Sequence, residues 1–191
     1  MNMSSIAALS DPFPALHEAT IKHRRDHGCG AYVFDDGAGL AALSAQHRPR
    51  RILELGTALG YTACCLASGS PEAHVDTIER DLVHVELARR AIEQANLSQR
   101  ITVHAGEFSA VLPGLTKASY DFAFFDGFAP STAILNALED LVVSGGVLVC
   151  ANIGLATPAE AQQIAGAFGD TSQWRQITAL ENGATSAWVK V

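Results

Sequence analysis

The chain has 191 residues, which allows one domain of ordinary size and leaves little room for a second. Apolar residues make up 48% of it and charged residues 17%, a balance that excludes an intrinsically disordered protein. The formal net charge of -7 excludes a protein that binds nucleic acid through a broad basic surface, because such a surface has to neutralise phosphates. We therefore expect no nucleic-acid partner.

The sequence also bears on the cellular setting. The longest uncharged stretches, residues 55–71 and 141–159, are interrupted by Gly, Ser, Thr and Pro, so we expect no transmembrane helix and no membrane partner. Residues 1–10 lack the basic start and apolar core of a secretory signal, which predicts a cytoplasmic protein. The four cysteines show no C-x-x-C spacing and are expected to be reduced, mostly buried thiols.

The predicted elements begin with an N-terminal preamble, residues 1–50. One helix is expected to start at Asp11-Pro12 and a second to cover residues 35–47. We expect the preamble to cover a pocket or to form an interface. Residues 51–191 are the core of what we expect to be one domain overall, and strand-like and helix-like segments alternate along them.

Five short apolar runs predict parallel strands. Some of these runs show no alternation of apolar and polar residues, as expected for strands covered on both faces. The strands are expected at 51–56, 74–79, 101–106, 120–126 and 146–151, with helices at 60–69, 81–96, 107–112 and 131–142 between them. Thr157 and Pro158 begin a last helix, and the pair Asn182-Gly183 predicts a final antiparallel hairpin. These elements predict an α/β fold with a mostly parallel, doubly wound sheet.

The most informative segment is residues 54–62, with the sequence ELGTALGYT, at a predicted strand-to-helix turn. Gly56 and Gly60 allow a ligand to approach the backbone, and the start of the following helix offers free N–H groups. A dinucleotide-binding turn needs G-x-G-x-x-G, but Ala58 and Tyr61 occupy its second and third glycine positions. This mismatch disfavours an NAD-dependent oxidoreductase.

Two acidic residues narrow the choice of ligand. Glu54 is expected at the mouth of the turn, where it would repel a pyrophosphate but suits a ligand with an ammonium and a sulfonium group. Those are the charges of S-adenosylmethionine. Glu79 ends the second predicted strand, where a carboxylate can accept both hydroxyls of an adenosine ribose. The turn and the two acids together predict S-adenosylmethionine as the cofactor.

The core resembles the class I S-adenosylmethionine-dependent methyltransferases, and among them the catechol and caffeoyl-CoA type O-methyltransferases. The resemblance covers roughly residues 51–191, while the preamble matches only loosely. The segments that carry it are 54–62, 77–80, 105–107, 120–126 and 145–152. It implies a Rossmann-like, seven-stranded sheet with one antiparallel strand, in agreement with the predicted C-terminal hairpin.

The resemblance also implies a set of cofactor contacts. Gly106, Glu107 and Phe108 would lie beside the adenine, and Asp126 would close the methionine end of the site. Phe128 occupies the position of an adenine-contacting aromatic residue, although a core or lid role fits it equally well. The full expected set is Glu54, Gly56, Thr57, Gly60, Tyr61, Thr62, Glu79, Arg80, Gly106, Glu107, Phe108, Asp126 and Phe128.

The chain departs from the metal-dependent members of this family. They hold a divalent cation with an Asp after the fourth strand and an Asp-Asn pair after the fifth. Here Asp126 fills the first position, but the pair reads Ala151-Asn152, and Ala129 replaces a Lys of the catechol enzymes. Because Mg²⁺ needs near-octahedral oxygen ligation, we expect no strong metal site here. Asp126 would then orient or deprotonate the methyl acceptor, with Asn152 as a hydrogen-bonding helper or only a loop cap.

The histidines offer one further candidate. His23 and His27 lie four residues apart on a predicted helix, so they could clamp a metal ion or supply a base. We expect solvated or interface histidines instead. His74, His84 and His104 have no visible partner in the sequence and receive no role.

The predicted function is an S-adenosylmethionine-dependent O-methyltransferase. Its partner would be a small-molecule methyl acceptor with a hydroxyl group, a class that includes aromatic compounds. Catalysis would consist chiefly of aligning the acceptor oxygen with the sulfonium and of removing the acceptor proton. Two alternatives stay open: a small-molecule N-methyltransferase, and a cofactor-binding methyltransferase-like protein without transferase activity. Because the family is often dimeric, the N-terminal helices are candidates for a homodimer contact.

Overall fold

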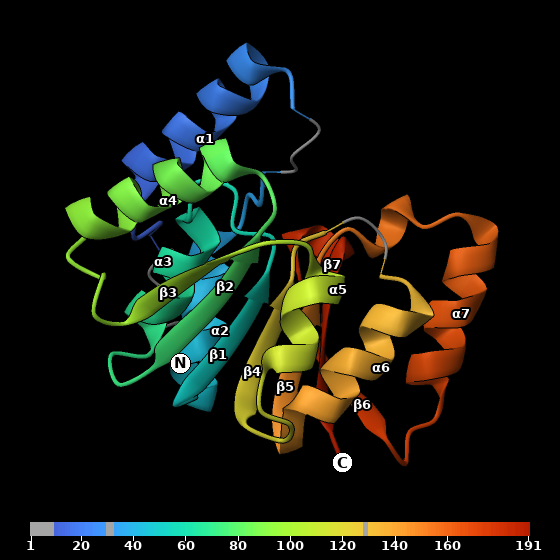
Figure 1. Ribbon diagram of the computed structural model, residues 1–191. Helices are drawn as coiled ribbons and strands as arrows, with labels where there is room; N and C mark the ends of the chain where they lie inside the picture. The colour runs from blue at the N-terminus through green and yellow to red at the C-terminus, as the bar shows by residue number, and fades with distance from the viewer. Residues whose placement is uncertain (1–9, 30–32, 128–129) are drawn as a thin grey trace, which may run out of the picture.

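A computed structural model describes residues 10–29, 33–127 and 130–191. One seven-stranded sheet runs through the molecule in the order β3-β2-β1-β4-β5-β7-β6 (Figure 1). Strands β1 to β5 pair in parallel, and β7 is antiparallel to both β5 and β6. The strands are β1 (Arg51–Leu55), β2 (His74–Glu79), β3 (Ile101–Ala105), β4 (Tyr120–Phe125), β5 (Val142–Cys150), β6 (Trp174–Leu180) and β7 (Thr185–Lys190). The predicted sheet and its C-terminal antiparallel pair are confirmed.

Helices cover both faces of the sheet (Figure 1). They are α1 (Pro14–His27), α2 (Gly37–His47), α3 (Tyr61–Gly69), α4 (Leu82–Gln94), α5 (Phe108–Val111), α6 (Thr132–Leu141) and α7 (Pro158–Gly169). Side-chain caps fix several helix starts: Asp81 accepts N–H groups of α4, and Thr157 forms the expected capping box with Glu160 at α7. In the described part of the chain, none of these helices has the length and apolar character needed to cross a membrane.

Several element boundaries differ from the expected ones, and two of the differences have a visible cause. Helix α1 begins at Pro14 and not at Asp11-Pro12, because the Asp11 carboxylate accepts the Phe13 N–H at 2.8 Å and holds the chain in a turn before the helix. Strand β5 begins at Val142, before the expected residue 146, because Val142 pairs with Tyr120 ahead of an irregularity in the register.

The buried core lies in two layers, one on each face of the sheet. The preamble contributes Phe34, Leu40 and Leu43 to the same buried cluster as Ile52 of β1. The preamble therefore covers one face of the sheet and does not stand apart from it, whereas its role as an interface stays a prediction. The expectation of mostly buried thiols is confirmed: Cys64, Cys65 and Cys150 are buried, and Cys29 is partly exposed.

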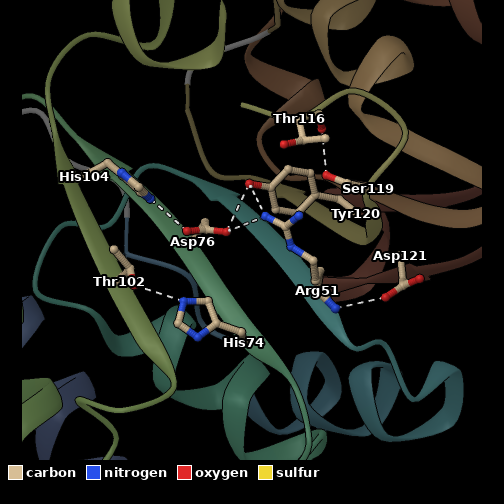
Figure 2. Close-up of polar contacts among 9 residues, drawn as sticks. All are labelled: Arg51, His74, Asp76, Thr102, His104, Thr116, Ser119, Tyr120 and Asp121. Atoms are coloured by element: carbon tan, nitrogen blue, oxygen red, sulfur yellow. Dashed lines mark hydrogen bonds and ion pairs between the residues drawn. The ribbon is translucent and has the colours of Figure 1, made fainter. Parts of the chain in front are cut away.

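A polar network crosses the face of the sheet opposite to the one that the preamble covers (Figure 2). The Asp76 carboxylate accepts hydrogen bonds from the Arg51 guanidinium at 3.3 Å and the Tyr120 hydroxyl at 3.0 Å, and contacts Nε2 of His104 at 2.8 Å. The Arg51 guanidinium also lies over the Tyr120 ring, 4.5 Å from its centroid. This network links β1, β2, β3 and β4 through one buried carboxylate.

We expect Asp76→Asn to lower the free energy of unfolding by about 1 to 3 kcal/mol, because the network loses its charged acceptor. Burial by itself would raise the pKa of Asp76, but hydrogen bonds from its three partners outweigh burial and hold the pKa below its usual value. The stabilisation is therefore present above the ordinary carboxyl pKa and is lost as the pH falls through the lowered pKa of the folded state. Urea unfolding at neutral and acidic pH measures both effects.

Asp140→Asn is the matched control, since Asp140 forms an exposed ion pair with Lys117 and surface pairs contribute little. If Asp76→Asn and Asp140→Asn unfold at the same urea concentration, the buried network does not stabilise the sheet.

Candidate active site

A cavity of about 430 Å³ opens at the carboxyl ends of β1, β2 and β4. This size is typical of a pocket for a small ligand. In an open parallel sheet ligands bind at these strand ends, next to the point where the strand order reverses, which here lies between β1 and β4. The walls are formed by Cys29, Gly56, Ala58, Ile78, Glu79, Arg80, Asp81, His84, Gly106, Glu107, Phe108, Phe125, Asp126, Gly127, Ser131 and Ile134.

The turn after β1 brings the backbone close to the residue that follows β4. Gly56 has a φ of +104°, and a Cβ at this position would lie 2.8 Å from the backbone oxygen of Asp126. Gly60 caps the start of α3 with a φ of +86°. A residue with a side chain would adopt this backbone conformation only with strain. Glycine is therefore favoured by the close approach of the Asp126 backbone at position 56 and by the left-handed backbone at position 60, as the sequence predicts for a turn that a ligand approaches.

Glu79 is fixed by the backbone at the end of β2. Its Oε2 accepts the N–H of Ala58 in the turn at 2.9 Å, and its Oε1 accepts the N–H of Asp81 at 2.9 Å. Each carboxylate oxygen keeps a further lone pair, and the side chain lines the cavity. Glu79 is thus held in place and can accept hydrogen bonds from two neighbouring hydroxyl groups.

The segment after β3 forms one side of the cavity. Gly106, Glu107 and Phe108 all line it, and Arg80 approaches Glu107 with 3.5 Å between Nη1 and Oε1 across its rim. Inside this rim the walls are apolar, being formed by Ile78, Phe108, Phe125 and Ile134. A flat aromatic group fits between such walls.

The structure corrects the expected position of Glu54. Its side chain is fully buried beneath the turn and takes no part in the cavity wall, because β1 is a central strand covered on both faces, so residues 52–55 are all buried. Oε2 accepts the Thr77 hydroxyl, to which the Thr57 hydroxyl in turn donates. Oε1 has no hydrogen-bond partner among the described residues.

Burial raises the pKa of Glu54 to about 7; the hydroxyl groups of Thr62 and Thr77 oppose this rise, and the nearby Glu79 carboxylate adds to it. A buried carboxyl group with an unpartnered oxygen is suited to a cationic neighbour. Its role toward a cofactor stays a prediction.

Asp126 follows β4 and faces the turn. Burial raises its pKa well above the usual carboxyl value, and the carboxylates of Glu54 and Glu181 add to the rise. The amide nitrogen of Asn152 lies 3.4 Å from Oδ1 of Asp126 and donates to the Gly127 carbonyl at 2.9 Å. Asn152 is buried with a φ of +60°, so it both shapes its loop and borders the acid.

A second, much smaller cavity adjoins the first, since Ala58 and Asp126 line both. Thr57, Tyr61 and Thr62 line it as well. The Tyr61 ring stacks on His17 with 4.7 Å between centroids, and its hydroxyl donates to Asp11 at 2.8 Å. The ring of Tyr61 therefore packs against the preamble, and a ligand contact through its backbone N–H stays a prediction.

The expected cofactor set divides according to this geometry. The large cavity brings together Gly56, Glu79, Arg80, Gly106, Glu107, Phe108 and Asp126, and the small one Thr57, Tyr61, Thr62 and again Asp126. Glu54 and Gly60 are buried and line neither cavity. Phe128 lies outside the described residues. Some wall residues were not predicted. Ile78 and Phe125 directly precede Glu79 and Asp126, so their position at the strand ends could have been predicted from the sequence. Cys29 and His84 come from segments that only tertiary packing joins.

The described residues do not fit a family-type Mg²⁺ site near Asp126. Asp126 supplies one carboxylate and Asn152 one amide oxygen, which are fewer protein oxygens than the family's metal site offers to Mg²⁺. Ala151 is fully buried in the apolar cluster under the sheet and offers no ligand atom. We derive no chemical step through a metal ion at this position, and the absence of Mg²⁺ dependence stays a prediction.

The chain is similar in sequence to known methyltransferases. Residues 53–153 match a methyltransferase domain family. A catechol O-methyltransferase of Mycobacterium tuberculosis is 31% identical over 125 residues, which are 64% of this chain and 57% of that protein. The chain spans about half the length of the curated relatives it matches.

Two solved structures share the fold. The O-methyltransferase TomG from Streptomyces achromogenes, involved in tomaymycin synthesis and solved in complex with S-adenosylmethionine, has a TM-score of 0.82 and 21% identity over 98% of this chain and 93% of its own. An O-methyltransferase from Bacillus cereus, solved with S-adenosylhomocysteine, has a TM-score of 0.76 and 24% identity over 98% and 94%. The family match covers more than half of the chain and includes the glycine turn and the ends of β2, β4 and β5, so this protein belongs to the methyltransferase domain family.

Proposed function

We propose that this protein is an S-adenosylmethionine-dependent O-methyltransferase that acts on a small hydroxyl compound, phenols included. One observation carries the proposal: the carboxylates of Glu79 and Asp126, at the ends of β2 and β4, face one cavity on either side of the glycine turn. The names of the catechol O-methyltransferase relatives and of the two similar structures support it.

The cavity offers complementary groups for each part of S-adenosylmethionine. Glu79 is placed to accept the ribose hydroxyls, and the apolar walls around Phe108 and Phe125 suit the adenine. Asp126 lines the other end, with the Glu54 carboxyl group buried beneath the turn nearby, and this arrangement suits a ligand with a sulfonium and an ammonium group. When bound, S-adenosylmethionine supplies an electrophilic methyl group.

Asp126 is the group that would accept the proton of the acceptor hydroxyl. Burial and two nearby carboxylates raise its pKa, so its ionised form is a stronger base than an exposed aspartate and is better matched to a phenol. The proton passes from the acceptor oxygen to a carboxylate oxygen of Asp126. Asn152 is a positioning residue, because its amide borders Oδ1 and ties the loop after β5 to Gly127.

The test is methyl transfer from S-adenosylmethionine to a panel of phenols and amines. We expect at least one phenol to be methylated, at the same rate in Mg²⁺-free buffer and after Mg²⁺ is added, because Asp126 acts as a base and not as a metal ligand. A metal-dependent catechol O-methyltransferase assayed in parallel should require Mg²⁺.

The other outcomes separate the alternatives. Turnover of amines only would identify an N-methyltransferase, and cofactor binding without any turnover would identify a protein that lost transferase activity. A strict requirement for Mg²⁺ would contradict the proposed role of Asp126. The cytoplasmic location, the lack of a nucleic-acid partner and a homodimer through the N-terminal helices stay predictions from the sequence.

A further inference from the structure

Four side chains of metal-ligating type meet beside the cavity, between α1 and α4. His23 and His27 lie one turn apart near the end of α1, Cys29 follows two residues after the helix, and His84 lies in the first turn of α4. The ligand atoms of these four residues all lie within 4.8 Å of one another. Figure 1 shows α1 running alongside α4. The cluster exists because the preamble packs on the core.

The three imidazole rings contact one another. The rings of His23 and His27 are stacked with centroids 4.7 Å apart, and the His84 ring meets them edge-on at 5.1 Å and 5.6 Å. Each ring brings a nitrogen lone pair into the same small volume. Such lone pairs repel one another unless a cation or a proton lies between them.

Two of these nitrogens are buried without a partner, which is an observation independent of the clustering. His84 is only 5% exposed. Its Nε2 and the Nε2 of His23 are buried and have no hydrogen-bond partner within the described ranges. Buried side-chain nitrogens nearly always have a partner, so each exception needs an explanation. A metal ion bound by these nitrogens is such a partner.

The donor set indicates which metal. Three imidazoles and one thiolate favour Zn²⁺, which takes four nitrogen or sulfur ligands in a tetrahedron, whereas Mg²⁺ and Ca²⁺ prefer oxygen. The other ring nitrogen of His84, Nδ1, lies 3.9 Å from Oε1 of Glu79. At hydrogen-bond distance, such a carboxylate would orient a metal-bound imidazole.

We propose that His23, His27, Cys29 and His84 bind one Zn²⁺ ion, which fastens the end of α1 to the start of α4. Four protein ligands complete the coordination shell, so the ion is structural. Because Cys29 and His84 also line the cavity, the ion holds part of its wall. The link through Glu79 to the ribose rests on the proposed function, whereas the metal site itself does not.

The experiment measures metal binding to untagged protein in the absence of cofactor and acceptor. In competition with a chromophoric chelator, we expect one Zn²⁺ per chain. With Co²⁺ as the probe, we expect intense tetrahedral ligand-field bands and a thiolate-to-cobalt charge-transfer band. Cys29→Ser should abolish the charge-transfer band, and His27→Ala should weaken Zn²⁺ binding by at least about tenfold. Both residues lie at the accessible end of α1, so the fold should tolerate both changes.

His74→Ala is the matched control, since the His74 ring contacts Thr102 at the edge of the sheet and belongs to no cluster of possible metal ligands among the described residues. Zn²⁺ should raise the Tm of the wild type and of His74→Ala, and raise it less in the two ligand variants. A wild-type chain that retains no Zn²⁺, or ligand variants with the wild-type affinity and Co²⁺ spectrum, would overturn the site. Neither result would decide whether the protein transfers methyl groups, and a failed methyl-transfer assay would leave the Zn²⁺ measurement unchanged.

Discussion

Asp126→Asn is expected to lower kcat for methyl transfer by about 10²- to 10⁴-fold, the usual contribution of a general base. Asparagine keeps the shape of the side chain but cannot take up the acceptor proton. The affinity for S-adenosylmethionine should change much less than kcat, so calorimetry beside steady-state kinetics separates proton transfer from cofactor binding. A variant with wild-type kcat would show that Asp126 does not act as the base.

The pH dependence gives a second measure of the same role. Burial, together with the carboxylates of Glu54 and Glu181, disfavours the charged form of Asp126, so its carboxyl group keeps a proton to a higher pH than usual. Activity should therefore rise as the pH increases through this raised pKa and should fall below it. The Asp126→Asn variant should lack this limb of the profile.

Two controls exclude trivial causes for a loss of activity. Asp121→Asn makes the same change at the opposite end of β4, where Asp121 accepts the N–H groups of Arg50 and Arg51 far from the cavity, and it should leave kcat unchanged. Because a raised carboxyl pKa means that the folded state disfavours the charge, Asp126→Asn should not lower the Tm at neutral pH. An equal loss of kcat in both variants would point to a general disturbance of β4.

Glu79→Ala is expected to weaken S-adenosylmethionine binding by about 1 to 3 kcal/mol, or about 5- to 150-fold, because two ribose hydroxyls lose their charged acceptor. Isothermal titration calorimetry measures the change directly. Glu86→Ala is the matched control, since Glu86 pairs with Arg89 on the exposed side of α4. It should bind the cofactor as the wild type does.

Glu79 also holds the backbone N–H groups of Ala58 and Asp81, so a loss of affinity alone does not prove a ribose contact. A cofactor analogue that lacks one ribose hydroxyl separates the two effects. It should bind the wild type more weakly than the natural cofactor does, but both should bind Glu79→Ala about equally. If loss of the ribose hydroxyl weakens cofactor binding as much in the variant as in the wild type, Glu79 does not contact the ribose.

The sequence by itself determined the strands, the glycine turn and two of the acids that matter most. The reason is that these features are local: apolar runs define the buried strands, and glycine marks positions where an L side chain is strained. Glu79 could be placed because it ends a predicted parallel strand, and such strands meet at the carboxyl edge of the sheet, whereas Asp126 was placed by the family resemblance; both line the cavity.

Only the tertiary structure decided the position of Glu54, the Asp76 network and the cluster around His84. Glu54 is buried because β1 lies between β2 and β4 with both faces covered, and β2 supplies its partner Thr77. Asp76 meets its partners through the strand order β3-β2-β1-β4, which differs from the order along the chain. His84 joins α1 only through packing of the preamble on the core. Contacts between residues distant in the chain depend on how whole elements pack, and no local pattern encodes them.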